Sequence, residues 1–346
     1  MPTDLPLALT MGDPAGVGPI ITFMARDAIR ARGGRPFYVV AHEAALREPG
    51  QLVWGGTPEG HGDMMVIDDP SPERVARAWE RGLPVLTFGD SYMEAKLGQP
   101  DPAHAPLIID SIRIATEHVQ QGKAAAVVTN PIAKALLYRA GFKHPGHTEY
   151  LAELAADGGE PPRPVMMLVG GGLRVALVTI HKPLAAVIPS LSTDLIGETG
   201  RIVHAALKRD FGLAAPRIGL CGVNPHAGED GEIGREEIDI VNPAAAQLHA
   251  EGIDISDARP GDTIFHEARN GRWDAVVAMY HDQGLIPVKT LDMWGGVNVT
   301  LGLPFIRTSP DHGVAYDAAA SGKANADSLI AALRLADSMA RARAAS

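Results

Sequence analysis

Short apolar segments alternate with helical patterns along almost the whole chain. Residues 124–130 and 274–280 are largely apolar runs of the kind found in strands buried on both faces of a sheet. Residues 105–122 repeat apolar side chains near the helical period, and residues 325–343 form a closing amphipathic pattern. Residues 165–180 are typical of two strands joined by a glycine turn, which makes one antiparallel element. The alternation predicts an α/β protein with a mostly parallel sheet and helices on both of its faces.

The composition favours some classes of protein and argues against others. With 346 residues the chain is long for one core, so we expect two domains or one elaborated α/β unit. An excess of 41 acidic over 31 basic residues argues against nucleic acid or an anionic membrane as the main partner. Without a signal peptide or an apolar stretch near the roughly 18 residues of a membrane span, we expect a soluble cytoplasmic protein. The single cysteine, Cys221, lies in an apolar run and is expected to be a small buried hydrophobe.

Three of the predicted strands are each followed by a histidine: His181, His226 and His281. Because ligands of open α/β sheets bind outside the carboxyl ends of the strands, we expect these imidazoles to converge there. Three such ligands with open positions are typical of a catalytic centre for Zn, Co, Ni or Fe, and Mn or Mg also stay open. The spacings match no local metal motif, and the alternative is that each histidine caps its own loop. Asp282, beside His281, either orients that imidazole or caps the loop.

Other polar residues are candidates for anion binding. His147 and Thr148 stand at the predicted start of a helix, where Thr148 either caps the helix or joins His147 in presenting donors to a substrate. Lys289, Asn298 and Arg307 are spaced nine residues apart, each among apolar neighbours. Lysine and arginine facing the same crevice would bind a phosphate or a carboxylate, and ordinary surface cations are the alternative.

A glycine-rich turn follows the first predicted strand. Gly12, Gly16 and Gly18 resemble the dinucleotide fingerprint, but Ile21 stands where that fingerprint requires glycine or alanine. The sequence therefore does not predict a standard Rossmann pyrophosphate site, and a tight structural turn is the alternative. Residues 228–237 form an acidic loop after His226, a candidate ribose-binding or lid element.

Several stretches together resemble one enzyme family. The stretches are "MGDPAGVGP", "TNPIAK", "GHTEYLAEL", "NPHAGEDGEIG", "AMYHDQG" and "GVNVTLGLPFIRTSPDHG". They are similar to the 4-hydroxythreonine-4-phosphate dehydrogenases of vitamin B6 biosynthesis, over residues 5 to 340. The resemblance implies an NAD(P)-dependent oxidation of the substrate's secondary alcohol to a β-keto acid, which loses CO2 to give 3-amino-2-oxopropyl phosphate. Ile20 and Val314 depart from residues common in the family, and neither is a matched metal or substrate position.

The resemblance also implies a site. The family's ligands for one divalent ion (Zn, Mg or Co) match the three strand-end histidines. Its substrate-contacting residues match His147, Thr148, Lys289, Asn298 and Arg307. Among these, Lys289 and His147 are the expected catalytic residues, with Lys289 the candidate for proton transfer. The choice between NAD and NADP and the residues that bind the cofactor stay open.

The family's fold implies two α/β/α domains arranged as in the isocitrate-type dehydrogenases. We expect residues 1–130 with 305–346 to form the first domain, and residues 131–304 to form the second, which carries the metal and most substrate residues. The active site is expected in the interdomain cleft and completed across a homodimer interface, so the three histidines need not come from one subunit. The rival interpretations are a related dehydrogenase of a phosphorylated sugar acid or a cyclic dihydrodiol, and a metallohydrolase or phosphate-acyl transferase on a similar scaffold.

Overall fold

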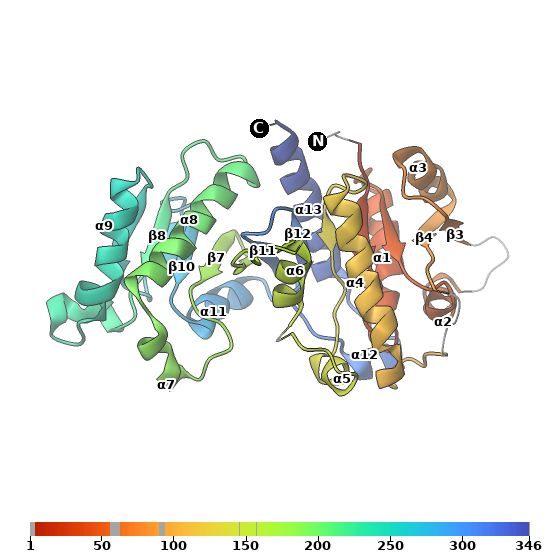
Figure 1. Ribbon diagram of the computed structural model, residues 1–346, viewed down its shortest axis with the longest axis horizontal. Helices are drawn as coiled ribbons and strands as arrows, with labels where there is room; N and C mark the ends of the chain where they lie inside the picture. Colours follow the sequence, from red (N-terminus) through yellow and green to blue (C-terminus); the bar gives the residue numbers. More distant parts are fainter. Residues whose placement is uncertain (1–3, 56–62, 90–93, 145, 157, 346) are drawn as a thin grey trace. The chain divides into compact units, whose positions relative to one another are not determined.

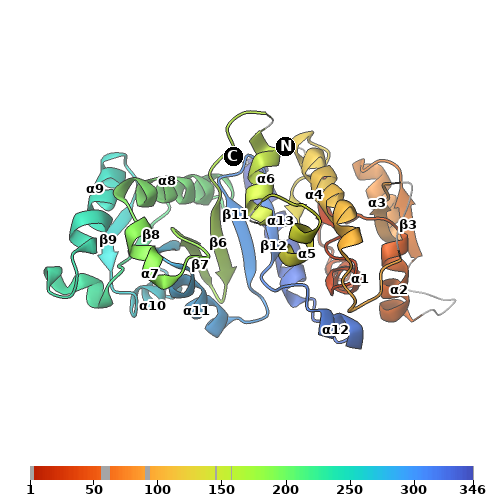
Figure 2. The ribbon, with the colours of Figure 1, turned by 60° about the horizontal axis from the view of Figure 1, so that its bottom comes forward.

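The structure is a computed structural model, and Figures 1 and 2 show its alternating strands and helices. It describes residues 4–55, 63–89, 94–144, 146–156 and 158–345. The expected α/β class with mostly parallel strands is confirmed. Within these residues, no helix is both long and apolar enough to cross a membrane.

The chain divides into two compact units. Unit 1 comprises Met1–Pro162 with Leu303–Ala344, and unit 2 comprises Arg163–Gly302 with the last two residues. Residues 131–162 thus belong to unit 1, whereas the sequence analysis assigned them to the second domain. The reason is that the helix at the end of this stretch packs on a helix of unit 1, where Gln120 Nε2 donates to the Leu154 carbonyl at 2.9 Å.

In the sheet of unit 1, neighbouring strands pair in parallel. Its strands lie in the order β3-β4-β2-β1-β5-β12. The strands are β1 (Leu7–Thr10), β2 (Phe37–Val40), β3 (Asp63–Ile67), β4 (Gly82–Leu86), β5 (Val127–Val128) and β12 (Arg307–Pro310). The helices are α1 (Gly18–Arg30), α2 (Ala44–Trp54), α3 (Pro72–Arg81), α4 (Ala105–Gln120), α5 (Lys134–Arg139), α6 (His147–Ala156), α12 (Tyr316–Ser321) and α13 (Asp327–Ala345). The apolar segments become buried strands because helices cover them, as the absence of polar alternation predicted.

The sheet of unit 2 is mixed. Its order is β11-β6-β7-β10-β8-β9, parallel from β7 to β9, while β6 pairs antiparallel with both β11 and β7. The strands are β6 (Val165–Gly170), β7 (Leu173–Leu177), β8 (Ile218–Cys221), β9 (Ile255–Arg259), β10 (Ala275–Ala278) and β11 (Val297–Leu301). The helices are α7 (Leu184–Val187), α8 (Thr193–Arg209), α9 (Asn242–Ala250), α10 (Ile264–Arg269) and α11 (His281–Leu291). The predicted hairpin is confirmed, because β6 and β7 are joined through Gly171 and Gly172, which both have positive φ.

One local expectation is wrong. The residues after His281 were expected to form a loop, but they form α11, whose buried Leu285 and Val288 are three residues apart on the inner face. Gly284 and Pro287 are poor helix formers, so the helix is hard to recognise in the sequence. Packing against the core outweighs their low helix propensity. Cys221 is fully buried as expected, and this burial raises the pKa of its thiol.

Candidate functional site

Two of the predicted metal-binding histidines lie together in unit 2. His181 follows β7, and His281 begins the helix after β10. These two strands are parallel neighbours, with Val276 opposite Val175, so their carboxyl ends lie side by side. The imidazole centroids of the two histidines are 5.6 Å apart. Neighbouring strands in the sheet thus produce the proximity that the sequence predicted.

The histidine pair has a donor set that fits a divalent ion. With ligand bonds of about 2 Å, two imidazoles on one tetrahedral ion have centroids roughly 5–6 Å apart. His281 Nδ1 lies 2.8 Å from Asp282 Oδ1, so this carboxylate fixes the orientation and tautomer of the ring. Nε2 of His281 is then the ring nitrogen available to an ion.

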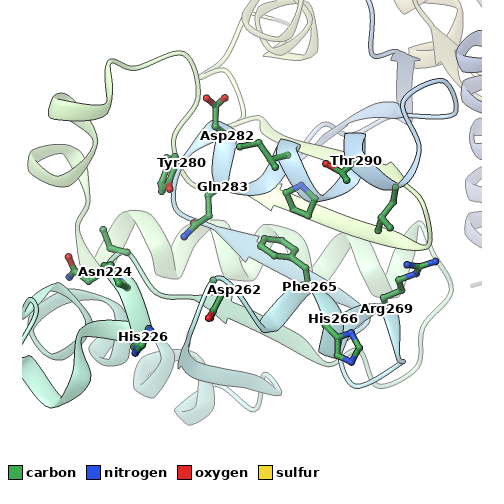
Figure 3. Close-up of a pocket in the computed structure, with 16 residues that line it drawn as sticks. Asn224, His226, Asp262, Phe265, His266, Arg269, Tyr280, Asp282, Gln283 and Thr290 are labelled. Atoms are coloured by element: carbon green, nitrogen blue, oxygen red, sulfur yellow. The ribbon is translucent and has the colours of Figure 1, made fainter.

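His226 lies elsewhere in unit 2. Although β8 is the other parallel neighbour of β10, residues 226–230 all have positive φ, which turns the chain away after the strand. Nδ1 of His226 lies 2.5 Å from Glu229 Oε1, and 63% of the side chain is exposed. His226 lines a cavity of about 880 Å³, and Figure 3 shows it on the opposite side of that cavity from Asp282.

The three histidines therefore do not converge within one chain. His181 and His281 line a second cavity of about 220 Å³, which shares Tyr280 and Asp282 with the first. In the part of the chain that the structure describes, no three His, Cys, Asp or Glu side chains are placed to hold a metal ion. The strand order thus brings two of the three imidazoles together, and metal binding by the three histidines stays a prediction.

The acidic loop of residues 228–237 is anchored at Glu237. This carboxylate is buried and accepts hydrogen bonds from the backbone N–H groups of Val223 and Asn224, both at 2.7 Å. Because those residues follow β8 directly, Glu237 determines the course of the segment that carries His226. These hydrogen bonds support the loop, and its role in ribose binding or as a lid stays a prediction.

Arg307 is a buried cation in unit 1. The residue begins β12 and is 3% exposed. It stands opposite Val127 of β5, and one of its terminal N–H groups donates to Thr129 Oγ1 at 2.7 Å, two residues further along. Burial lowers the pKa of the guanidinium to about 10, so Arg307 is still charged at neutral pH. A desolvated positive charge of this kind binds anions more strongly than an exposed one.

His147 lies close to that charge. It is the first residue of α6, so Thr148 lies inside the first turn and is not the residue that caps the helix. Burial, followed by the charges of Arg307 and Lys134, holds the pKa of His147 well below its ordinary value. Its Nε2 is buried and has no hydrogen-bond partner among the described residues. Unit 1 thus gathers a neutral imidazole and two cations at the start of a helix.

Lys289 and Asn298 belong to unit 2. Lys289 lies on α11, eight residues after His281, which places it roughly 12 Å further along the helix axis. Lys289 therefore does not lie beside the histidine pair within unit 2. A short loop after His281, in place of this helix, would have allowed it to return there. Asn298 lies in β11 opposite Leu168 of β6, and its Oδ1 is a buried acceptor without a hydrogen-bond partner in the residues described.

The glycine turn after β1 packs closely against Asn130. Gly12 has φ +74°, and a Cβ at this position would lie 2.6 Å from the Cβ of Asn130. Asn130 Nδ2 in turn donates to the Thr10 carbonyl at 3.0 Å and to Thr22 Oγ1 at 2.9 Å. These contacts give the turn the structural role that the sequence analysis left as an alternative.

Sequence reasoning missed Thr129, Asn130 and Lys134. They follow the buried strand β5 in the same way as the histidines follow their strands. The strand-end rule would have found them if it had been applied to threonine, asparagine and lysine as well as to histidine.

Comparison with known proteins assigns the family. Residues 35–336 match the model of the pyridoxal phosphate biosynthetic protein PdxA. The 4-hydroxythreonine-4-phosphate dehydrogenase of Bradyrhizobium diazoefficiens is 50% identical over 98% of both chains.

Solved structures agree. The 4-hydroxythreonine-4-phosphate dehydrogenase of Klebsiella pneumoniae is 38% identical, with a TM-score of 0.83 over 97% of this chain and 99% of that one. A terephthalate 1,2-cis-dihydrodiol dehydrogenase from Burkholderia xenovorans is 25% identical, with a TM-score of 0.65 over 96% of this chain and 98% of that one. The protein described here therefore belongs to the PdxA family of pyridoxal phosphate biosynthetic proteins.

Proposed function

We propose that this protein is a 4-hydroxythreonine-4-phosphate dehydrogenase that depends on NAD or NADP and on one divalent ion (Zn, Mg or Co). The observation that carries the proposal is the 50% identity, over nearly the whole of both chains, to a protein of that name. The histidine pair and the buried Arg307 support it, since the substrate brings an alcohol to be oxidised and two anionic groups to be bound.

The reaction has two stages. Hydride leaves the carbon of the secondary alcohol for the nicotinamide ring as the hydroxyl proton is removed, which gives a β-keto acid and reduced cofactor. The carboxylate then leaves as CO2, and protonation gives 3-amino-2-oxopropyl phosphate. When bound, a divalent ion supplies charge withdrawal from an alcohol or ketone oxygen.

The residues of this chain have distinct roles in the proposal. Arg307 binds an anionic group of the substrate, and the neutral His147 donates a hydrogen bond to it, helped by Thr148 in the same turn. Lys289 moves the proton, and Asn298 orients the substrate. A lysine is suited to this because its pKa responds strongly to its surroundings.

The site is proposed to need two subunits. His226 faces a different cavity from His181 and His281, so we infer that the third ligand is His226 of the partner subunit. Unit 2 also exposes large apolar side chains on and after α11, among them Ile286, Met293 and Trp294, which an interface would cover. The homodimer and the cytoplasmic location stay predictions.

The test of activity is an absorbance assay for reduced nicotinamide with 4-phosphohydroxy-L-threonine, NAD+ or NADP+, and enzyme stripped of metal or reloaded with it. We expect reduction only in the reloaded enzyme, and its loss in His281→Ala. Reduction only with a phosphorylated sugar acid or a dihydrodiol would transfer the protein to a related dehydrogenase. Turnover without any cofactor would favour the hydrolase.

The shared site has its own test. His226→Ala and His281→Ala variants are each expected to be inactive, but a mixture that exchanges subunits forms heterodimers with one intact site. Random exchange should restore roughly a quarter of wild-type activity, because a two-fold axis pairs the sites. If all three ligands came from one chain, mixing would restore nothing.

A further inference from the structure

The start of α6 in unit 1 has a second cationic neighbour, Lys134, besides the predicted Arg307. Lys134 begins α5, a few residues after β5, and its side chain is exposed. A Cβ placed on Gly146 would lie 2.9 Å from Lys134 Nζ. The ammonium group therefore lies against the residue that immediately precedes His147. A side chain at Gly146 would require this ammonium group to shift.

The surroundings of His147 are positive. The charged groups that affect its pKa are Arg307 and Lys134, and both act to lower it. The backbone N–H groups in the first turn of the ten-residue helix α6 add the positive end of its dipole. Two cations, a buried imidazole nitrogen and a helix N-terminus thus act on the same small region. An anion with several oxygens and more than one negative charge, such as a phosphate group, is the ligand that suits such a region best.

Arg307 and Lys134 contribute to this region differently. Arg307 is held inside the unit by its hydrogen bond to Thr129, so its position is fixed before any ligand arrives. Lys134 is exposed, so its flexible side chain reaches a bound anion from the solvent side. A phosphate between them would be bound by one preorganised and one mobile cation.

A competing explanation involves Glu149. Its Oε2 would lie 3.1 Å from the same Cβ on Gly146, so this carboxylate and the Lys134 ammonium flank one position. If Lys134 served only to balance Glu149, neutralising either residue would have the same effect. If Lys134 binds an anion, the two substitutions act in opposite directions, because Glu149 repels the anion.

We propose that Lys134 is a further substrate-binding residue, which binds the phosphate group of the substrate together with Arg307 and His147. The identity of the anion as the substrate's phosphate rests on the proposed function, whereas anion binding by Lys134 does not.

The experiment is isothermal titration of inorganic phosphate into the full-length protein and its variants. Lys134→Met should weaken phosphate binding about 10-fold, which corresponds to about 1.4 kcal/mol, and Lys134→Arg should restore most of it. Glu149→Gln should raise phosphate affinity, because it removes a negative charge beside the anion. Lys323→Met removes an exposed lysine elsewhere in unit 1 and is the matched control for the loss of one charge.

Three results would overturn the proposal. They are a Lys134→Met variant that binds phosphate as well as wild type, a Glu149→Gln variant weakened as much as Lys134→Met, and a wild type that binds no phosphate. Urea unfolding of each variant separates loss of binding from loss of folding.

Kinetics distinguish this proposal from the proposed function. If both hold, Lys134→Met raises KM for 4-phosphohydroxy-L-threonine about 10-fold with little change in kcat. If the wild type binds phosphate through Lys134 but does not oxidise this substrate, the proposed function fails and the anion site stands.

Discussion

Replacing Arg307 by methionine should make the protein more stable and less able to bind its substrate. Arg307 is a cation with 3% exposure, so the folded protein bears the cost of removing its charge from water. Methionine has a similar length and no charge. A buried charge that lowers stability needs a functional reason, and the reason we propose for Arg307 is anion binding.

The magnitude follows from the pKa. Burial lowers the pKa of Arg307 from its ordinary value to about 10, which corresponds to about 3 kcal/mol of unfavourable free energy for the charged form. The hydrogen bond to Thr129 offsets about 1–2 kcal/mol of this, and its loss leaves a buried hydroxyl unpaired. We therefore expect Arg307→Met to be about 1 kcal/mol more stable than wild type. The double variant with Thr129→Val should gain more, up to about 3 kcal/mol, because it leaves no unpaired hydroxyl at position 129.

The pH dependence gives a second check. The folded pKa of this cation lies below its ordinary value, so the cost is present in full well below about pH 10 and is relieved as the pH rises through that value. The stability advantage of Arg307→Met over wild type should thus stay nearly constant from neutral pH to about pH 9 and should shrink as the pH rises above about 10.

The assay is urea unfolding followed by circular dichroism, together with KM for the substrate. Loss of a buried charge pair with the substrate should raise KM about 100-fold or more. The reasoning is refuted if the double variant is less stable than wild type, if the advantage does not vary with pH, or if KM is unchanged.

Three further outcomes are expected. Asp282→Asn should weaken binding of the divalent ion about 10- to 100-fold, because a neutral amide replaces the carboxylate that accepts from His281 Nδ1. Competition with a chromogenic chelator measures this, and an unchanged affinity would argue against the histidine pair as ligands. Tyr316→Phe removes the hydrogen bond to Asp13 Oδ2 at 2.5 Å and should cost about 2 kcal/mol at neutral pH in urea unfolding. Burial raises the pKa of Asp13, so this carboxyl becomes neutral in the folded protein as the pH falls, and the penalty should then shrink; a constant penalty would contradict the assignment. Cys221 should react with a thiol reagent only after unfolding, and rapid labelling of the native protein would be inconsistent with its burial.

Much of the fold could be predicted because its signals are local. The buried strands β1, β5 and β10 appear in the sequence as apolar runs, and amphipathic helices such as α4 and α13 repeat their buried side chains at the helical period. The prediction was wrong at α11, where Gly284 and Pro287 oppose helix formation locally and the core still selects it. The extent of the first domain could not be predicted either, because the contact of α6 with α4 joins residues distant in the chain.

For the site, the sequence by itself determined that a histidine follows each of three strands, and it predicted lysine and arginine as candidates for anion binding. Only the tertiary structure decided which of them meet. His181 and His281 lie together because β7 and β10 are neighbours, whereas five residues of positive φ direct His226 elsewhere. The burial of Arg307, the neutrality of His147 and the approach of Lys134 to Gly146 likewise depend on contacts between residues that the chain separates. The physical reason is that periodicity reports which face a residue occupies, while proximity and desolvation depend on which elements pack against each other.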